Sequence, residues 1–365
     1  MPVTATDYSY MSRALQLAQK GLYTTDPNPR VGCVIVKDGE VVAEGWHERS
    51  GEPHAEVHAL QQAGDKASDA TVYVTLEPCC HHGKTPPCSD ALVNAKVSRV
   101  VVAMQDPHSR VAGQGLQQLR EAGIEVEVGV LETQARALNP GFIKRMQSGR
   151  PYVRNKLAMS LDGRTAMASG ESKWITSDAA RLDVQRLRAR SSAILTGVGT
   201  VLADDPSMTV RLDEAERQPL RVVLDTHLSM PTNAKLLQQA GRTLVMTCSE
   251  DEEAKEALEQ AGAEVICTPF HSNTVDMQAV LDTLGEIEIN EVLLETGATL
   301  SGAMLKAGLI DELVIYMAPV LMGDNARGLF RLPFLDSMEQ KIQLNISDIR
   351  AVGQDWRITA TVDRS

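Results

Sequence analysis

The segments GEPHAEVHAL (51–60) and TLEPCCHHGKTPPCSDAL (75–92) decide how the first part of the chain folds. Both alternate between strand and helix patterns. We expect a helix over 54–64 that ends at glycine, a strand over 71–78 that ends at proline, and a helix over 86–96 that begins at proline. These segments place His54, Glu56, Cys79 and Cys88 at the junctions between elements.

The sequence around these segments continues the alternation. VGCVIVKDGEVVAEGWH (31–47) predicts a hairpin that turns at Asp38-Gly39. Helix and strand patterns then alternate until a last helical stretch, which is interrupted near Pro140-Gly141. Together they predict a three-layer α/β/α domain over residues 1–149.

A second domain is expected over residues 150–365, since Gly149-Arg150-Pro151 interrupts the pattern. It begins with a strand over 152–160 and a long helix near 178–190. Strands and helices continue to alternate, which predicts a mainly parallel sheet covered on both faces. The chain ends in a predicted antiparallel hairpin that turns near Gly353-Gln354.

His54, Cys79 and Cys88 have the chemistry of a metal site. One imidazole and two thiolates suit Zn²⁺ and leave a fourth tetrahedral position open for water, as in a catalytic site. Glu56 follows His54 by two residues and is expected to take a proton from that water and return it to the reacting molecule. Cys80 is an alternative ligand to Cys79, and a structural zinc protein is an alternative to an enzyme.

The remaining cysteines, Cys33, Cys248 and Cys267, lie in apolar strand patterns and are expected to be buried. Six cysteines, three of them within ten residues, are a poor disulfide framework. With no basic and apolar leader at the N-terminus, this usage predicts a cytoplasmic protein.

The composition of the chain limits the classes of molecule that it is expected to bind. The net charge of −12 and the 4% of aromatic residues argue against nucleic acid, and favour a small molecule as substrate. No stretch approaches the ~20 apolar residues that cross a bilayer, so no membrane partner is expected. The apolar segment near 311–320, which we expect to be an edge of the sheet, permits a homo-oligomer without requiring one.

In the second domain, the residues alone offer one candidate ligand site. EVLLETGATLSGAMLKAG (291–308) predicts a buried strand, a glycine-bounded turn and a helix whose first N–H groups would suit a dinucleotide pyrophosphate. The turn matches neither the phosphate-loop nor the dinucleotide fingerprint. The residues alone therefore leave open whether it binds a cofactor.

The H-A-E and P-C residues resemble the cytidine-deaminase superfamily, whose signature is H-x-E followed by P-C-x-x-C. Here eight residues, not two, separate Cys79 from Cys88. That spacing, with PNPRVGCVIVKDG (27–39) and GEPHAEVHAL (51–60), is similar to the deaminase half of the bifunctional riboflavin-biosynthesis deaminase/reductase family. Asn28 and Lys84 would then contact the substrate, although a turn role also explains Asn28 and solvation also explains Lys84.

The second domain resembles the reductase half of the same family. The resemblance lies in KLAMSLDGRTAMASGESKWITS (156–177), ILTGVGTVLADDPSMTVR (194–211) and LLETGATLSGAML (293–305). It implies a dihydrofolate-reductase-like fold that uses NADPH. The segment 212–290 carries the least recognisable sequence.

The resemblance also assigns residues. Those implied to hold NADPH are Ala158, Trp174, Thr200, Asp204, Thr226, Gly297, Ala298, Thr299, Leu300, Ser301, Gly302 and Ala303. Those implied to meet the substrate are Lys156, Ser172, Arg188, Met208, Arg211 and Glu295. Arg188 and Arg211 are candidate phosphate ligands, because arginine pairs bidentately with phosphate. Two alternatives stay open: Arg188 as a surface residue, and Lys156 as a structural ion-pair residue.

The resemblance implies two steps on 2,5-diamino-6-ribosylamino-4(3H)-pyrimidinone 5′-phosphate. A zinc-dependent hydrolytic deamination comes first, and NADPH then reduces the ribosyl group to a ribityl chain. Lys156 or Glu295 would assist opening of the ribose ring. The main alternative is a zinc deaminase whose second domain binds a ligand without catalysis, and a second is a deaminase that edits nucleic acid.

Overall fold

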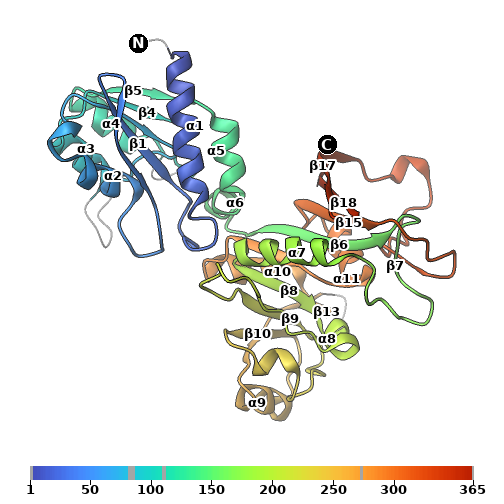
Figure 1. The fold of residues 1–365 in the computed structure, drawn as a ribbon. Coiled ribbons are helices and arrows are strands. Elements are labelled where there is room, and N and C mark those ends of the chain that lie inside the picture. Colours follow the sequence, from blue (N-terminus) through green and yellow to red (C-terminus); the bar gives the residue numbers. More distant parts are fainter. Residues whose placement is uncertain (1–2, 81–86, 109–111, 272–273, 364–365) are drawn as a thin grey trace. The chain divides into compact units, whose positions relative to one another are not determined.

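The computed structural model describes residues 3–80, 87–108, 112–271 and 274–363. Contacts between Cα atoms divide the chain into two compact units, Met1–Gly149 and Arg150–Ser365 (Figure 1). In the part of the chain that is described, no helix is both long and apolar enough to span a bilayer. Each unit is built around its own sheet.

The first unit contains a five-stranded sheet in the order β2-β1-β3-β4-β5. β1 pairs antiparallel with both β2 and β3, whereas β3, β4 and β5 are parallel. The strands are β1 (Gly32–Lys37), β2 (Glu40–Trp46), β3 (Thr71–Val74), β4 (Arg99–Val102) and β5 (Glu125–Val128).

Helices cover both faces of this sheet. A Cβ atom on Gly32 would meet the Ala14 carbonyl oxygen of α1 at 2.0 Å, and one on Gly45 would meet that of Ala55 in α2 at 2.3 Å. Gly45 pairs with Cys33, which points to the face opposite Gly32, so α1 and α2 lie on opposite faces. The helices are α1 (Ala5–Gln19), α2 (Ala55–Ala63), η1 (Gly64–Ala67), α3 (Cys88–Asn94), α4 (Gln114–Glu121), α5 (Glu132–Leu138) and α6 (Pro140–Ser148).

The second unit has a nine-stranded sheet in the order β11-β10-β9-β8-β14-β6-β15-β18-β17. The strands from β11 to β15 are parallel, and the last hairpin adds β18 and β17 antiparallel, as predicted. The strands are β6 (Tyr152–Ser160), β8 (Ala193–Gly197), β9 (Leu220–Leu224), β10 (Thr243–Thr247), β11 (Glu264–Cys267), β14 (Glu291–Leu294), β15 (Glu312–Ala318), β17 (Leu344–Val352) and β18 (Asp355–Val362). Two short ladders pair β7 (Arg164–Ala166) with β16 (Arg327–Gly328) and β12 (Phe270–His271) with β13 (Thr274–Val275).

Helices also cover both faces of the second sheet. Apolar side chains of α10 and α11 pack on one face, and those of α7, α8 and α9 pack on the other. The helices are α7 (Asp178–Arg190), α8 (Val198–Asp204), η2 (Lys235–Gln238), α9 (Glu252–Gln260), α10 (Met277–Glu286), α11 (Ala298–Lys306) and η3 (Met338–Gln340). The predicted α/β class of both units is confirmed.

Three local predictions were wrong. The segment near 311–320, expected to be an edge, forms β15, which lies between β6 and β18 and is largely buried. β3 ends at Val74 instead of residue 78, because the chain leaves the sheet and the Glu77 carboxylate accepts bonds from distant backbone amides. Cys267 is exposed, because β11 is an edge strand of the sheet, and Cys248 is only partly buried, whereas Cys33 is buried as expected.

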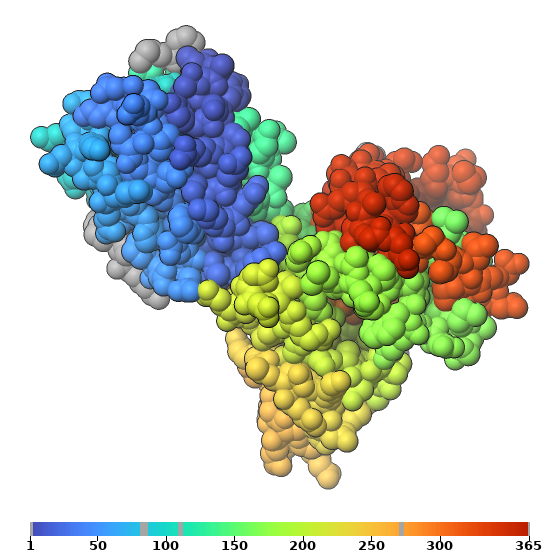
Figure 2. Space-filling view, viewed as in Figure 1, coloured from blue at the N-terminus to red at the C-terminus, as the bar shows by residue number. Residues whose placement is uncertain are grey.

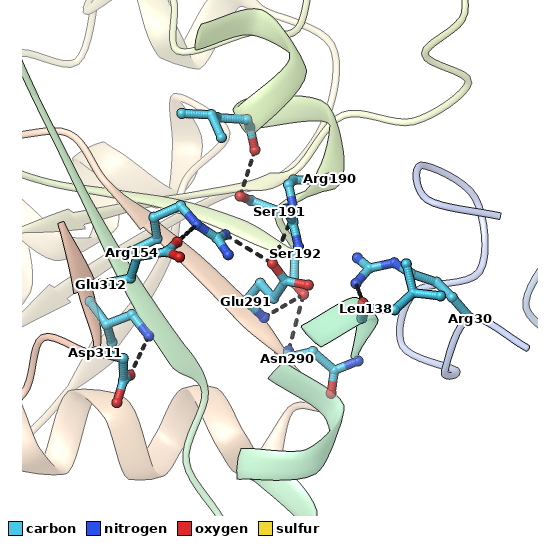
Figure 3. A network of polar contacts seen from close by, with 12 residues as sticks. Arg30, Leu138, Arg154, Arg190, Ser191, Ser192, Asn290, Glu291, Asp311 and Glu312 are labelled. Atoms are coloured by element: carbon cyan, nitrogen blue, oxygen red, sulfur yellow. Dashed lines mark hydrogen bonds and ion pairs between the residues drawn. The ribbon is translucent and has the colours of Figure 1, made fainter. Parts of the chain in front are cut away.

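A network of buried ion pairs connects β6, β14 and β15 in the middle of the second sheet (Figure 3). Arg154 of β6 is 3% exposed, donates to Glu291 of β14 over 2.9 Å and also pairs with Glu312 of β15. Arg190 is a further partner of Glu291, at 3.2 Å. Because a buried carboxylate is costly without a counter-charge, these pairs fix the relative positions of three neighbouring strands.

Candidate active sites

His54, Cys79 and Cys88 converge in the first unit, with their ligand atoms within 4.8 Å of one another. His54 is the N-cap residue of α2, and Cys88 is the first residue of α3. His54 Nδ1 lies 3.3 Å from Cys88 Sγ and 3.6 Å from Cys79 Sγ. The imidazole therefore presents Nδ1 to both thiols.

These distances fit a zinc ion. Ligand atoms about 2.1 Å (nitrogen) and 2.3 Å (sulfur) from a tetrahedral zinc lie about 3.6 Å apart. The hydrogen bond with the Cys88 thiol lowers the pKa of Cys79 to about 4, and His54 contributes to this shift. Cys80 instead directs its thiol to Gln114 Oε1 at 3.7 Å, outside the cluster.

The loop that carries Cys79 is held by contacts that the sequence analysis missed. The buried Glu77 carboxylate accepts hydrogen bonds from the amides of Asp106, Gly113 and Gly115, each at 3.0 Å. A Cβ atom on Gly115 would meet the Pro78 carbonyl oxygen at 2.2 Å. These contacts fix the backbone on either side of Pro78. Because Glu77 is separated from its partners by 29 to 38 residues, local sequence gives no signal for this role.

The other side of Cys79 faces the start of α3. The Cys88 amide donates to Cys79 Sγ over 3.3 Å, and the Ser89 amide donates to the Cys79 carbonyl over 3.1 Å. Backbone N–H groups at a helix start favour a thiolate over a thiol. Cys88 is the first residue of α3, and the Cys79 sulfur accepts a hydrogen bond from the backbone at that same helix start.

Glu56 lies in the first turn of α2 and is 3% exposed. Burial raises the pKa of this carboxyl to about 7, although the charge of His54 opposes the shift. A carboxyl group whose pKa lies near neutrality is suited both to accept and to donate a proton. The two-residue spacing from His54 thus places a candidate base beside the candidate metal ligands.

Asn28 is linked to the metal cluster by His47, which contacts both Asn28 and His54. Sequence alone did not single out His47. His47 is 2% exposed, and its Nδ1 lies 3.1 Å from the Pro53 carbonyl oxygen, to which it must donate. Nε2 is then the acceptor for the Asn28 amide, at 3.1 Å. This orients the Asn28 side chain, whose amide oxygen has no hydrogen-bond donor among the described residues. The His47 and His54 rings meet edge to face at 5.4 Å. Lys84 lies outside the described residues.

In the second unit, the candidate residues gather where parallel strands end. Leu294 of β14 pairs with Asn155 and with Leu195, so Glu295 emerges beside Lys156 of β6. In open parallel sheets, ligands bind outside the carboxyl ends of the strands, where the winding reverses. β14 and β6 lie at that reversal, between the β8–β11 block and β15.

Glu295, Arg188 and Lys156 form a charged cluster at this edge. Arg188 Nε and Nη2 donate to the two Glu295 oxygens over 2.6 and 2.8 Å. Arg188 is only 12% exposed, so it is not a surface residue. Lys156 has no hydrogen-bond or ion-pair partner among the described residues, which argues against a structural ion pair. Burial lowers the pKa of Lys156, and the charge of Glu295 opposes this shift.

The candidate NADPH residues lie around the same edge. Ala158 lies within β6, Thr200 and Asp204 belong to α8, and Thr226 follows β9. Asp204 pairs with Lys173 at 3.2 Å, next to Trp174, which is 72% exposed and stacks with Arg181. In α11, residues 297–303 form the N-cap and first turns. There Ser301 and Gly302 are buried, and a Cβ atom on Gly302 would meet the Arg331 carbonyl oxygen at 2.2 Å.

The candidate substrate residues lie in two loops. Ser172 lies between β7 and α7, and Met208 and Arg211 lie between α8 and β9. Met208 is buried, with a positive φ of 49°, whereas Arg211 is exposed. Arg211 is therefore better placed than Arg188 to meet a charged group from solvent.

The fold and the two sites define a zinc-binding deaminase domain followed by a reductase domain, and comparisons with known proteins agree. Residues 4–104 match the cytidine and deoxycytidylate deaminase zinc-binding region, and residues 151–358 match the RibD C-terminal domain. A riboflavin biosynthesis protein RibD from Escherichia coli K12 is 53% identical over 361 residues, which cover 96% of this chain and 97% of that protein.

Solved structures show the same relationship. Acinetobacter baumannii RibD (form 1) is 48% identical, has a TM-score of 0.92 and is matched over 98% of this chain and 99% of its own. A deaminase/reductase from Thermotoga maritima, described as acting on diaminohydroxyphosphoribosylaminopyrimidine and 5-amino-6-(5-phosphoribosylamino)uracil, is 34% identical, with a TM-score of 0.85 and the same coverage. The chain belongs to the RibD family. It is a bifunctional deaminase and reductase of riboflavin biosynthesis, with Zn²⁺ and NADPH as its cofactors.

Proposed function

We propose that residues 1–149 deaminate 2,5-diamino-6-ribosylamino-4(3H)-pyrimidinone 5′-phosphate and that residues 150–365 then reduce its ribosyl group. The observation that supports the first step is the His54–Cys79–Cys88 cluster with buried Glu56 beside it. These three residues would hold Zn²⁺, which when bound would supply a fourth position for water and make that water easier to deprotonate. Glu56 would accept the two protons of the attacking water in turn, delivering the first to the ring nitrogen and the second to the departing ammonia. Asn28, oriented by His47, binds the substrate, and we assign Lys84 to the same task.

For the second step, NADPH supplies the hydride that reaches C1 of the opened ribosyl group. We propose that Lys156 and Glu295 handle the proton that ring opening moves, because both face the edge of the sheet where ligands bind. Ser172, Met208 and Arg211 line the substrate side. The N–H groups of residues 298–300 at the start of α11 suit the cofactor's pyrophosphate. Ala158, Trp174, Thr200, Asp204, Thr226 and the remainder of the 297–303 turn complete the proposed cofactor site.

Removing the metal should separate the two activities. Incubation with a zinc chelator is expected to stop ammonia release from the diamino substrate, because the attacking water loses its activation. NADPH oxidation with a substrate that is already deaminated should continue, and added Zn²⁺ should restore ammonia release. Metal content measured in the same samples reports on the site directly. Undiminished ammonia release from metal-free protein would exclude the zinc mechanism.

We also propose that the chain forms a homo-oligomer through β17, an edge strand, which lies in the red segment of Figure 2. Ile346, Ile349 and Trp356 share one face of the β17–β18 hairpin and are 58%, 55% and 47% exposed. If β17 pairs antiparallel with the same strand of a second copy about Ile349, Asp348 of each copy faces Arg350 of the other. Such a pairing would remove an exposed sheet edge. Light scattering should then give a multiple of the chain mass, and a monomer at all concentrations would refute the proposal.

We place the enzyme in the cytoplasm, where a small phosphorylated metabolite would be its partner. The support is that none of the six cysteines, all of which lie in the described residues, forms a disulfide, as expected in a reducing compartment.

A further inference from the structure

The loop that carries Asn28 has few backbone donors of its own. Pro27 and Pro29 lie on either side of Asn28, and neither has a backbone N–H to donate. The backbone N–H of Asn28 donates to the Thr25 carbonyl over 2.8 Å, which closes the loop on the side that follows α1. The other side of the loop, at Arg30, is therefore fixed by a different part of the chain.

Asn139 holds Arg30 from 109 residues away in the sequence. Its Oδ1 accepts from the backbone N–H of Arg30 over 2.8 Å, and its Nδ2 donates to the Arg30 carbonyl over 2.9 Å. In turn, Nη1 of Arg30 donates to the Leu138 carbonyl over 2.8 Å (Figure 3). Three hydrogen bonds thus join Arg30 to two consecutive residues where α5 ends and α6 begins.

The Asn139 side chain is a buried partner on a fixed backbone. Asn139 is the C-cap of α5 and the N-cap of α6, and it is 4% exposed. Its backbone N–H donates to the Arg136 carbonyl over 3.1 Å, and its carbonyl accepts from the Ile143 N–H over 3.0 Å. Because an asparagine amide carries both a donor and an acceptor, it can satisfy both backbone groups of Arg30 at once.

Arg30 lies between Asn28 and the start of β1. Pro29 joins Arg30 to Asn28 with a restricted φ, so a shift of Arg30 is passed on to Asn28. On the other side, the Val31 carbonyl accepts from the His47 backbone N–H over 2.9 Å, and His47 Nε2 accepts from the Asn28 side chain over 3.1 Å. The backbone at Arg30 thus determines where Asn28 lies relative to the ring that orients it.

We propose that Asn139 is a positioning residue of the deaminase, which fixes the backbone at Arg30 and thereby the direction of the Asn28 side chain. The proposal rests on the substrate role given to Asn28 above, and it adds a residue that the deaminase motif does not contain. Loss of both Asn139 hydrogen bonds should leave the three metal ligands in place and misplace Asn28. The effect should therefore be confined to the first of the two reactions.

The test measures Asn139→Ala in the full-length holoenzyme. We expect kcat/KM for ammonia release from the diamino substrate to fall roughly 10- to 100-fold, since a misplacement of about 1 Å can cost about 100-fold. Zinc content, and NADPH oxidation with the deaminated substrate, should match the wild type. Asn94→Ala, the same change at an exposed position of the first unit, is the matched control and should leave both reactions unchanged.

A double-mutant cycle separates positioning from a general structural role. In an Asn28→Ala background, Asn139→Ala should lower kcat/KM by less than about 3-fold further, because the side chain that it positions is already gone. Full additivity of the two substitutions would overturn the proposal, because Asn139 would then act on the unit as a whole. Loss of zinc from Asn139→Ala would overturn it for the same reason.

The single variants show which of the two proposals fails. If Asn28→Ala releases ammonia at the wild-type rate, Asn28 does not bind the substrate, and the positioning role of Asn139 falls with it. If Asn28→Ala is slow and Asn139→Ala is not, the substrate role of Asn28 stands and the positioning role of Asn139 is wrong.

Discussion

Replacement of Glu56 by glutamine is expected to abolish deamination while zinc stays bound. The glutamine side chain has nearly the volume of the glutamate, and the three metal ligands are untouched. An amide cannot take a proton from water at neutral pH, so the rate of ammonia release should fall roughly 10²- to 10⁴-fold. Metal content and ammonia release are measured on the same preparation.

The matched control for Glu56→Gln is Glu40→Gln, an exposed glutamate in β2 of the same unit. It makes the same chemical change away from the metal ligands and should leave ammonia release unchanged. NADPH oxidation with deaminated substrate should be normal in both variants. If Glu56→Gln binds zinc and releases ammonia at the wild-type rate, Glu56 has no part in the reaction.

Replacement of Lys156 by methionine is expected to have the largest effect on the reductase. Lys156 lies beside Glu295 with no partner of its own among the described residues, and burial lowers its pKa, which suits proton transfer. Methionine fills similar space but carries no proton. The reductase kcat should fall roughly 10²- to 10⁴-fold, with normal ammonia release.

Stopped-flow measurement of NADPH oxidation, with the deaminated substrate supplied directly, checks the Lys156→Met prediction. Lys341→Met, at an exposed position, is the control and should behave as wild type. Binding of NADPH should persist in Lys156→Met, which shows that the site is still formed. A variant that binds NADPH and reduces substrate at an unchanged rate would exclude Lys156 from proton transfer.

The zinc cluster could be predicted from sequence because its signal is local. His54 and Glu56 lie two residues apart, and Pro78-Cys79 and Cys88 follow within one loop and one helix start. The residue types alone limit the chemistry to a metal and a base. The alternating apolar patterns likewise predicted both sheets and the closing antiparallel hairpin.

What the sequence did not reveal depends on contacts between distant residues. Glu77 lies within a predicted strand, yet it binds amides about 30 to 40 residues further along the chain. His47 orients Asn28 through a hydrogen bond across 19 residues. Arg188 meets Glu295 from 107 residues away, so a helical arginine whose local pattern equally suits a surface residue is a buried partner. Contacts between residues so far apart in sequence depend on the order of the strands in the sheet, and local sequence patterns do not determine that order.

The central claim is that one chain carries out deamination and then reduction, and a single time course tests it most directly. Purified protein receives the diamino substrate with NADPH, and ammonia and NADPH are followed in the same sample. The account predicts that ammonia appears first, that NADPH falls after it, and that a zinc chelator stops both. If ammonia appears but NADPH is never consumed, the second unit is a binding module and the two-step account is wrong.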